Sequence, residues 1–162
     1  MKLGEILEVF LDTTFILPFF QLDIDIDGFT VERFRKFLSR LDKVYVSELS
    51  IYEAKAKLFR LSRMNRVYAD ALENFGDNLA VLRDDERICF RPYTKGDDFR
   101  FNLMWSKGLG LDVFDAIIVA QSVDVGLLIT EDTEILNLRN QEAFVEDPEL
   151  KKLEIRRWKE LC

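Results

Sequence analysis

The chain has 162 residues, with no histidine and only two cysteines, Cys89 and Cys162. Without imidazole there is no histidine general base, no serine–histidine–aspartate triad and no conventional zinc site that includes histidine. Two distant cysteines form neither a disulfide framework nor a zinc site by themselves, so a reducing cytoplasm is expected. Any catalysis must therefore rely on carboxylates, lysine, hydroxyl groups or a hard metal ion.

Long apolar runs are also missing. The apolar segments are short, such as residues 116–120, and fall far below the length of a membrane span. The first twenty residues do not resemble a signal peptide, because Asp12 interrupts the apolar stretch and no small-residue cleavage site follows. No internal repeat and no linker rich in proline, glycine or serine divides the chain. A single domain over residues 1–162, with no membrane segment, is expected.

The chain is acidic, with a formal net charge of −7. This charge argues against non-specific adhesion to nucleic acid over the whole surface. A local exception lies between Ala54 and Ala69, where basic residues occur and acids do not. We predict RNA contacts for four of these basic residues, Lys57, Arg60, Arg63 and Arg66. A solvated helix face is the alternative interpretation.

Strand-like and helix-like segments alternate along the chain. Strands are predicted at Ile6–Leu11, Lys43–Ser47, Arg87–Tyr93, Leu127–Thr130 and Leu153–Arg157. Helices are predicted at residues 15–20, ending near Pro18, after an N-cap at Thr30, and within residues 49–75, 97–107, 115–123 and 133–138. This alternation predicts an α/β domain with a mainly parallel sheet that helices cover on both faces.

Four acids are predicted at the carboxyl ends of these strands, where open parallel sheets bind their ligands. They are Asp12, Glu53, Asp115 and Asp132. Asp115 belongs to this group only if its helix begins at the same edge of the sheet. Converging carboxylates repel one another, so at neutral pH they either hold protons or bind a cation. Magnesium and manganese accept such oxygen ligands and can activate water, which predicts phosphodiester hydrolysis.

Each acid also has a purely structural interpretation. Asp112 is a natural N-cap, and Asp115 would then be a favourable first-turn acid. Asp132 could cap the helix at 133–138, and Glu53 could be a solvated helix residue. Asp12 is the hardest to explain in this way, because it ends a buried strand.

A second acidic segment, Asp23-Ile-Asp25-Ile-Asp27-Gly28, matches the first half of a calcium-binding loop. The glutamate expected at the twelfth position is missing, and Phe34 stands there. An acidic loop that leads into a helix cap is the preferred interpretation.

Four segments together resemble the PIN domain, the ribonuclease fold of VapC-type toxins and several RNA-processing enzymes. They are VFLDTTFIL at 9–17, SELSIYE at 47–53, DAIIVA at 115–120 and LITED at 128–132. Their order and spacing agree with the family, and each segment carries its acid. The region at 84–101 does not align with the family, and the chain is longer than a compact toxin of this type.

The resemblance implies a PIN-like three-layer α/β/α sandwich around a five-stranded parallel sheet. It implies that Asp12, Glu53 and Asp115 hold Mg²⁺ or Mn²⁺, with Asp132 as a fourth acid. Thr13 or Thr14 and Thr130 are similar to the family's hydroxyls near the metal. The implied activity is an endoribonuclease in which activated water attacks the phosphorus, leaving a 5′-phosphate and a 3′-hydroxyl.

The implied partners are single-stranded RNA, a second copy of the chain in a homodimer and, for a toxin, a small antitoxin protein. A catalytically silent module that binds RNA or a protein remains the alternative. A phosphatase with an aspartyl nucleophile would need a second aspartate two residues after Asp12, and Thr14 stands there.

Overall fold

The computed structural model describes residues 7–161. All five strands run parallel in one sheet, in the order β3-β2-β1-β4-β5. Their bounds are β1 (Glu8–Leu11), β2 (Lys43–Ser47), β3 (Ile88–Arg91), β4 (Leu127–Ile129) and β5 (Glu154–Arg156). Each lies within the segment predicted for it, and Ile6 of the first predicted strand lies outside the described residues.

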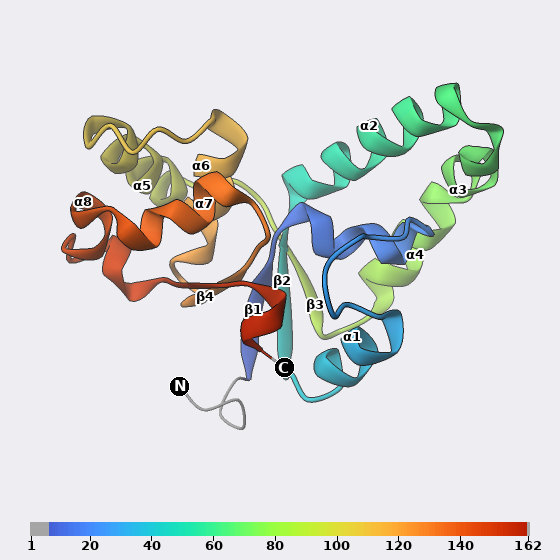
Figure 1. Ribbon diagram of the computed structural model, residues 1–162, viewed down its shortest axis with the longest axis horizontal. Coiled ribbons are helices and arrows are strands. Elements are labelled where there is room, and N and C mark those ends of the chain that lie inside the picture. Colours follow the sequence, from blue (N-terminus) through green and yellow to red (C-terminus); the bar gives the residue numbers. More distant parts are fainter. Residues whose placement is uncertain (1–6, 162) are drawn as a thin grey trace.

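Helices cover both faces of the sheet, as Figure 1 shows, and the predicted three-layer α/β/α arrangement is confirmed. One layer contains η2 (Thr13–Phe20), α1 (Val31–Leu38), α2 (Glu48–Met64), η3 (Arg66–Tyr68), α3 (Ala69–Glu73) and α4 (Phe75–Asp84). The other contains α5 (Lys95–Ser106), α6 (Val113–Ser122), α7 (Thr133–Asn137), η4 (Leu138–Asn140), α8 (Glu142–Val145) and η5 (Leu150–Lys152). No helix within residues 7–161 is long and apolar enough to span a membrane.

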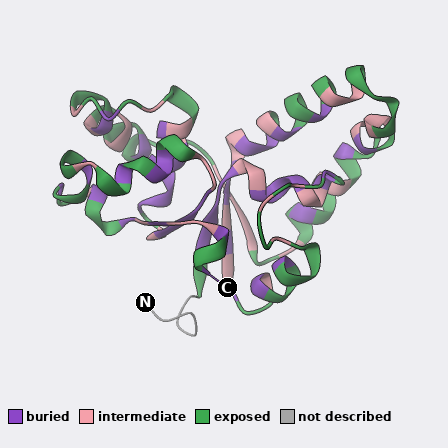
Figure 2. Ribbon diagram, in the orientation of Figure 1, coloured by how far each residue is buried: buried purple, intermediate pink, exposed green. Residues whose placement is uncertain are grey.

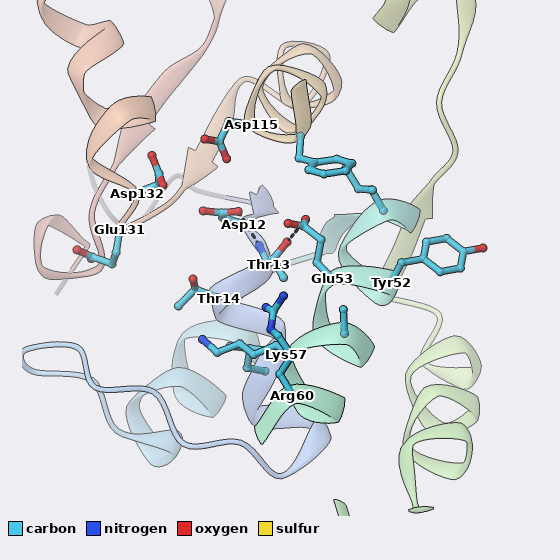
Figure 3. A pocket seen from close by; sticks show the side chains of 14 residues that line it. Asp12, Thr13, Thr14, Tyr52, Glu53, Lys57, Arg60, Asp115, Glu131 and Asp132 are labelled. Carbon is cyan, nitrogen blue, oxygen red and sulfur yellow. Dashed lines mark hydrogen bonds between the residues drawn. The ribbon is translucent and has the colours of Figure 1, made fainter. Parts of the chain in front are cut away.

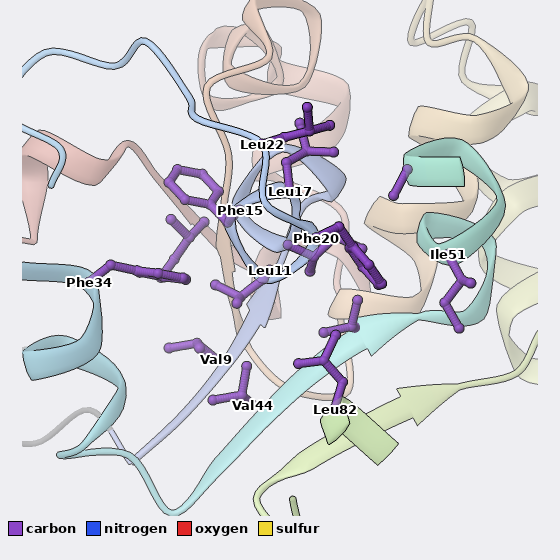
Figure 4. Close-up of a cluster of buried hydrophobic side chains, with 14 of the residues drawn as sticks. Val9, Leu11, Phe15, Leu17, Phe20, Leu22, Phe34, Val44, Ile51 and Leu82 are labelled. Carbon is purple, nitrogen blue, oxygen red and sulfur yellow. The ribbon is translucent and has the colours of Figure 1, made fainter. Parts of the chain in front are cut away.

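Alternate residues of the strands face two separate hydrophobic cores, which purple marks in Figure 2. On β1, Val9 and Leu11 pack against the α1–α4 layer, whereas Phe10 packs against the α5–α8 layer. Figure 4 shows the first of these cores. Trp158 of η6 (Trp158–Glu160) also belongs to it and is 1% exposed. Both faces of the central strand β1 are therefore buried, and a polar residue at its carboxyl end is buried as well.

The first helical segment corrects one prediction. The helix predicted at residues 15–20 is confirmed as η2, but the expected end near Pro18 is wrong, because η2 continues to Phe20 with Pro18 inside it. Proline removes only one backbone donor. Phe15 and Leu17 before it and Phe20 after it are buried, and Phe20 stacks on Phe75 with ring centroids 4.2 Å apart. Burial of these side chains on both sides of the proline holds the short helix together.

The helix predicted after Thr30 is confirmed as α1, with the Arg33 amide donating to the Thr30 hydroxyl. The long helical region predicted at 49–75 contains α2, η3 and α3, with breaks at Asn65 and Asn74. Asn65 has an extended backbone, and its side chain caps η3.

Helices α5 and α6 form an antiparallel pair that returns the chain to the functional edge of the sheet. Arg100, in the first half of α5, donates to both carboxylate oxygens of Asp124, which follows the end of α6. Met104 near the end of α5 and Leu109 just after it pack in one core with Ala116 at the start of α6. The start of α6, and Asp115 with it, therefore lies at the carboxyl edge of the sheet, which was the condition for Asp115 to belong to the site.

Candidate functional site

The candidate site lies at the carboxyl edge of the sheet, beyond the paired ends of the central strands β1 and β4. Leu11 is opposite Ile129, so the residues that follow these strands are neighbours. The Asp12 amide donates to the Ile129 carbonyl at 3.1 Å and continues the ladder by one residue. Asp12 and Thr130 are thereby placed side by side by the parallel register.

Asp12 is the most enclosed of the four predicted acids, at 7% exposure. Its Oδ1 accepts from the Thr13 amide at 2.7 Å, which makes Asp12 the N-cap of η2, and its Oδ2 accepts from the Thr130 hydroxyl at 2.6 Å. Burial raises the pKa of Asp12 from 3.8 to about 6, opposed by these hydrogen bonds and reinforced by the charges of Glu53 and Asp132. A buried carboxylate with two donors and no cation remains costly to ionise.

Glu53 reaches the site from α2 and is held by a chain of hydroxyls. The Thr13 hydroxyl donates to Glu53 Oε1 at 2.8 Å and lies 2.8 Å from the Ser50 hydroxyl. Because Thr13 has only one hydroxyl proton, Ser50 must be the donor of this second bond when Glu53 is ionised. Burial raises the pKa of Glu53, and the nearby charge of Asp112 adds to this effect.

Asp115, in the first turn of α6, faces the same space and is half-buried. The pKa of Asp115 is raised from 3.8 to about 7, mainly by burial and then by the charges of Asp132, Asp112 and Asp12. Among residues 7–161, none of the four predicted acids forms an ion pair with a basic side chain. The site therefore carries negative charge that the protein itself does not neutralise.

Asp132 serves two structural purposes at once. Its Oδ1 accepts from the amides of Glu134 and Ile135 and caps α7, as one interpretation of the sequence predicted. The same side chain lines the cavity beside Asp12, and its amide donates to the Thr130 hydroxyl. Capping and site membership are compatible, because the cap uses one carboxylate oxygen.

Asp112 is confirmed as the N-cap of α6, since its Oδ1 accepts from the amides of Phe114 and Asp115. It does not line the cavity. Asp23, Asp25 and Asp27 of the predicted acidic loop are exposed, and the loop is fixed by the Gly28 carbonyl, which accepts from Arg33 and from the Trp158 indole. Both observations agree with the structural interpretation of these acids.

The four acids line one cavity of about 740 Å³. Figure 3 shows Asp12, Asp115 and Asp132 on one side of it, with Lys57 and Arg60 of α2 on another. Thr13 and Thr14 also line the cavity. The other two predicted RNA contacts, Arg63 and Arg66, are exposed and are not part of this lining. The Arg63 guanidinium lies over the Phe59 ring, 5.7 Å from its centroid.

Several residues of the site were not selected from the sequence. The lining also includes Leu17, Leu49, Tyr52, Ala56, Phe114 and Glu131, and the buried Ser50 lies behind it. Glu131 is partly committed elsewhere, because its Oε1 accepts from the Trp158 amide at 2.8 Å. A usable signal existed for Ser50, which precedes Glu53 by one helical turn and so shares its face.

The donor set suits a hard divalent ion. All four side chains offer carboxylate oxygen, which Mg²⁺ and Mn²⁺ prefer. Within residues 7–161 no group of three or more acidic or cysteine side chains is arranged to hold one ion by itself. Magnesium commonly uses only one or two carboxylates together with water and substrate phosphate, so this open arrangement fits it. Asp12 and Asp115, with their raised pKa values, have the most to gain from a cation.

Comparison with known proteins gives a family and two structural likenesses. The crystal structure of PAE2754 from Pyrobaculum aerophilum is 21% identical, with a TM-score of 0.54 over 85% of this chain and 81% of that chain. The structure of VapBC2 from Rickettsia felis, bound to a DNA fragment from their promoter, is 14% identical, with a TM-score of 0.58 over 94% of this chain and 99% of that one. At these identities the likeness concerns the fold. Comparison with curated proteins gives no match.

The family model described as PIN domain matches residues 9–140, which include all four acids and most of the sheet. The parallel five-stranded sheet with helices on both faces agrees with this assignment. The chain therefore belongs to the PIN domain family, whose members are generally nucleases that depend on a divalent metal.

Proposed function

We propose that this protein is an Mg²⁺- or Mn²⁺-dependent endoribonuclease that hydrolyses RNA phosphodiester bonds at Asp12, Glu53, Asp115 and Asp132. One observation carries the proposal: carboxylates without ion-pair partners converge in a cavity that also presents Lys57 and Arg60. Negative charge that needs a cation and positive charge that attracts phosphate then lie on facing walls. That combination suits a phosphodiester substrate.

The roles of the side chains follow from their positions. Asp12 and Asp115 would hold the ion, and Asp132, which lines the same cavity, would bind it through water. When bound, the ion supplies charge stabilisation at the phosphate and a lowered pKa of water. Lys57 and Arg60 bind and orient the phosphate.

Glu53 would accept the proton of the attacking water. Thr13 donates to Glu53 Oε1, which leaves Glu53 Oε2 to accept that proton. The water oxygen bonds to phosphorus, the bond to the 3′-oxygen breaks and that oxygen takes a proton from solvent water. The products are a 5′-phosphate and a 3′-hydroxyl.

A toxin role, with a small antitoxin as partner, is part of the same proposal. Support comes from the likeness to VapBC2, whose structure was determined with a DNA fragment from their promoter. A homodimer stays a prediction of the family resemblance.

The test uses labelled single-stranded RNA with Mg²⁺ or Mn²⁺, with and without EDTA, and compares wild type with Asp115→Asn. Cleavage that requires metal and is lost in Asp115→Asn is expected, because this substitution removes a charged ligand and keeps the side-chain shape. Asp112→Asn is the matched control: asparagine also caps helices well and Asp112 does not line the cavity. RNA binding without cleavage under all metals would instead identify a silent binding module.

The structure also sharpens the prediction for the basic residues. The double substitution of Lys57 and Arg60 by glutamine should weaken RNA affinity about tenfold. It should also make the salt dependence shallower by about 0.7 for each lost phosphate contact. The same substitutions at Arg63 and Arg66 remove equal charge outside the cavity and should have a much smaller effect. RNA affinity is measured by fluorescence anisotropy across salt concentrations. If both double variants lose the same affinity, the four basic residues contribute only general surface charge and no specific contact.

A further inference from the structure

Two aromatic residues that no role above uses lie in the same cavity as the acids. Tyr52 directly precedes Glu53 on α2, and Phe114 directly precedes Asp115 on α6. Each aromatic residue therefore lies next to one of the acids on the same helix. In Figure 3, Tyr52 lies beyond Glu53 on the side away from Asp12, at the rim of the site.

Both rings are open to solvent. Tyr52 is 70% exposed and Phe114 is 48% exposed. Among the described residues neither ring stacks on another aromatic ring or on a cation, whereas the rings around Trp158 and Phe20 pack against one another in the core. The Tyr52 hydroxyl forms no hydrogen bond within residues 7–161. These two faces are thus free for a ligand.

The rest of the lining shows what kind of ligand would fit. Leu17, Leu49 and Ala56 add apolar surface to the lining of the cavity. These groups bind neither a metal ion nor a phosphate. A nucleotide, however, combines a charged phosphate with a flat, largely apolar base. With the phosphate at Lys57 and Arg60, the apolar and aromatic surface of the cavity is available to the bases attached on either side.

We propose that Tyr52 and Phe114 form a stacking rim for unpaired bases that flank the phosphate to be cleaved, which makes the site selective for single-stranded RNA. This inference rests on the proposed ribonuclease function. Every base has a π-face, so stacking tolerates any base and gives little sequence preference. In a duplex the bases already stack on one another and are not free to meet these rings.

The experiment measures binding of a fluorescent oligouridylate, an abasic RNA of the same length and an RNA duplex to the Asp12→Asn protein, which is not expected to cut them. Tyr52→Ala and Phe114→Ala should each weaken oligouridylate binding by about 5- to 150-fold, the range that corresponds to loss of one base–aromatic stack. Binding of the abasic RNA should not change, because it has no base to stack. Tyr52→Phe should bind normally, because the ring is kept.

Phe99→Ala is the control, since Phe99 is 64% exposed but does not line the cavity. Tyr52→Leu replaces Tyr52→Ala if the latter does not fold, because it keeps apolar volume without a ring. The inference is overturned if the aromatic variants bind oligouridylate normally, if the abasic RNA is weakened equally, or if duplex binds as well as single strand. If wild type cleaves RNA and the aromatic variants bind it normally, only the stacking rim is contradicted. If wild type neither binds nor cleaves RNA, the proposed function is contradicted as well.

Discussion

Asp12→Asn is expected to abolish metal-dependent RNA cleavage and, in EDTA at pH 8, to make the protein more stable. The loss of activity should reach at least about 100-fold, the factor that corresponds to roughly 3 kcal/mol of transition-state stabilisation. It follows from removal of the most buried carboxylate of the site. The expected increase in stability follows from the free-energy cost of keeping that buried carboxylate ionised in the wild-type protein.

The expected gain in stability can be estimated from the pKa of Asp12. A rise from 3.8 to about 6 corresponds to about 3 kcal/mol of destabilisation by the ionised form. Asparagine keeps an acceptor for the Thr13 amide, but the Thr130 hydroxyl loses the acceptor that it now has. If about half of the gain survives this loss, the melting temperature should rise by roughly 3–6 °C.

Asp147→Asn is the matched control for the same substitution. Asp147 is also buried, but its Oδ1 accepts from the amides of Glu149 and Leu150 and its Oδ2 pairs with Lys107 at 3.1 Å. These interactions outweigh burial, so the pKa of Asp147 is lowered instead of raised. This variant should be less stable than wild type and should cleave RNA normally. If Asp12→Asn kept its activity, or lost stability as Asp147→Asn does, Asp12 would be a structural cap and nothing more.

The second large effect is a loss of stability as pH rises, which a divalent metal ion is expected to reverse. Asp12 and Asp115 have folded-state pKa values above their unfolded values. The folded state therefore binds their protons more tightly, and the stability contributed by protonation is fully present below about pH 4 and is lost as pH rises through about 6 and 7. Between pH 5 and pH 8 in EDTA, Asp12 alone should cost at least about 1 kcal/mol of unfolding free energy.

Mg²⁺ or Mn²⁺ should restore this stability at pH 8 and have a smaller effect at pH 5, where protons compete for the same oxygens. Chemical denaturation at both pH values, with metal or EDTA, measures the effect. Acids with lowered pKa values, such as Asp124 and Asp147, act in the opposite direction but mainly below pH 4, outside this window.

Asp12→Asn supplies the internal control for this prediction, because it should flatten the pH dependence and reduce the response to metal. Stability that increases from pH 5 to pH 8 in EDTA would contradict the expected sign. A metal response of equal size in Asp12→Asn and in wild type would place the ion elsewhere.

Local sequence determined much of this protein. The strands at Lys43–Ser47 and Leu127–Ile129, the cap at Thr30 and the cap at Asp112 depend on residues next to one another in the chain, and all four are as predicted. The order of the acids relative to the strands also follows from the chain alone, because parallel strands bring their carboxyl ends to one edge. The absence of histidine leaves carboxylates as the available titrating ligands.

Only the tertiary structure decided which other side chains reach the site. Arg60 and Arg63 are both basic and lie one helical turn apart on α2, yet only Arg60 lines the cavity, because α2 extends away from the sheet and Arg63 lies one turn farther out (Figure 1). Ser50 joins the site through a hydrogen bond to Thr13, a residue 37 positions away.

The position of Asp115 is the clearest case. Its local sequence predicts a first-turn acid, but its place beside Asp12 depends on the antiparallel packing of α5 and α6, in which the interaction of Arg100 with Asp124 takes part. Such contacts between distant residues depend on how whole helices pack on a sheet, and local patterns do not encode them. The chain alone thus determined the chemistry of the carboxylates, and the packing of the helices decided which acids, cations and aromatic rings share one cavity.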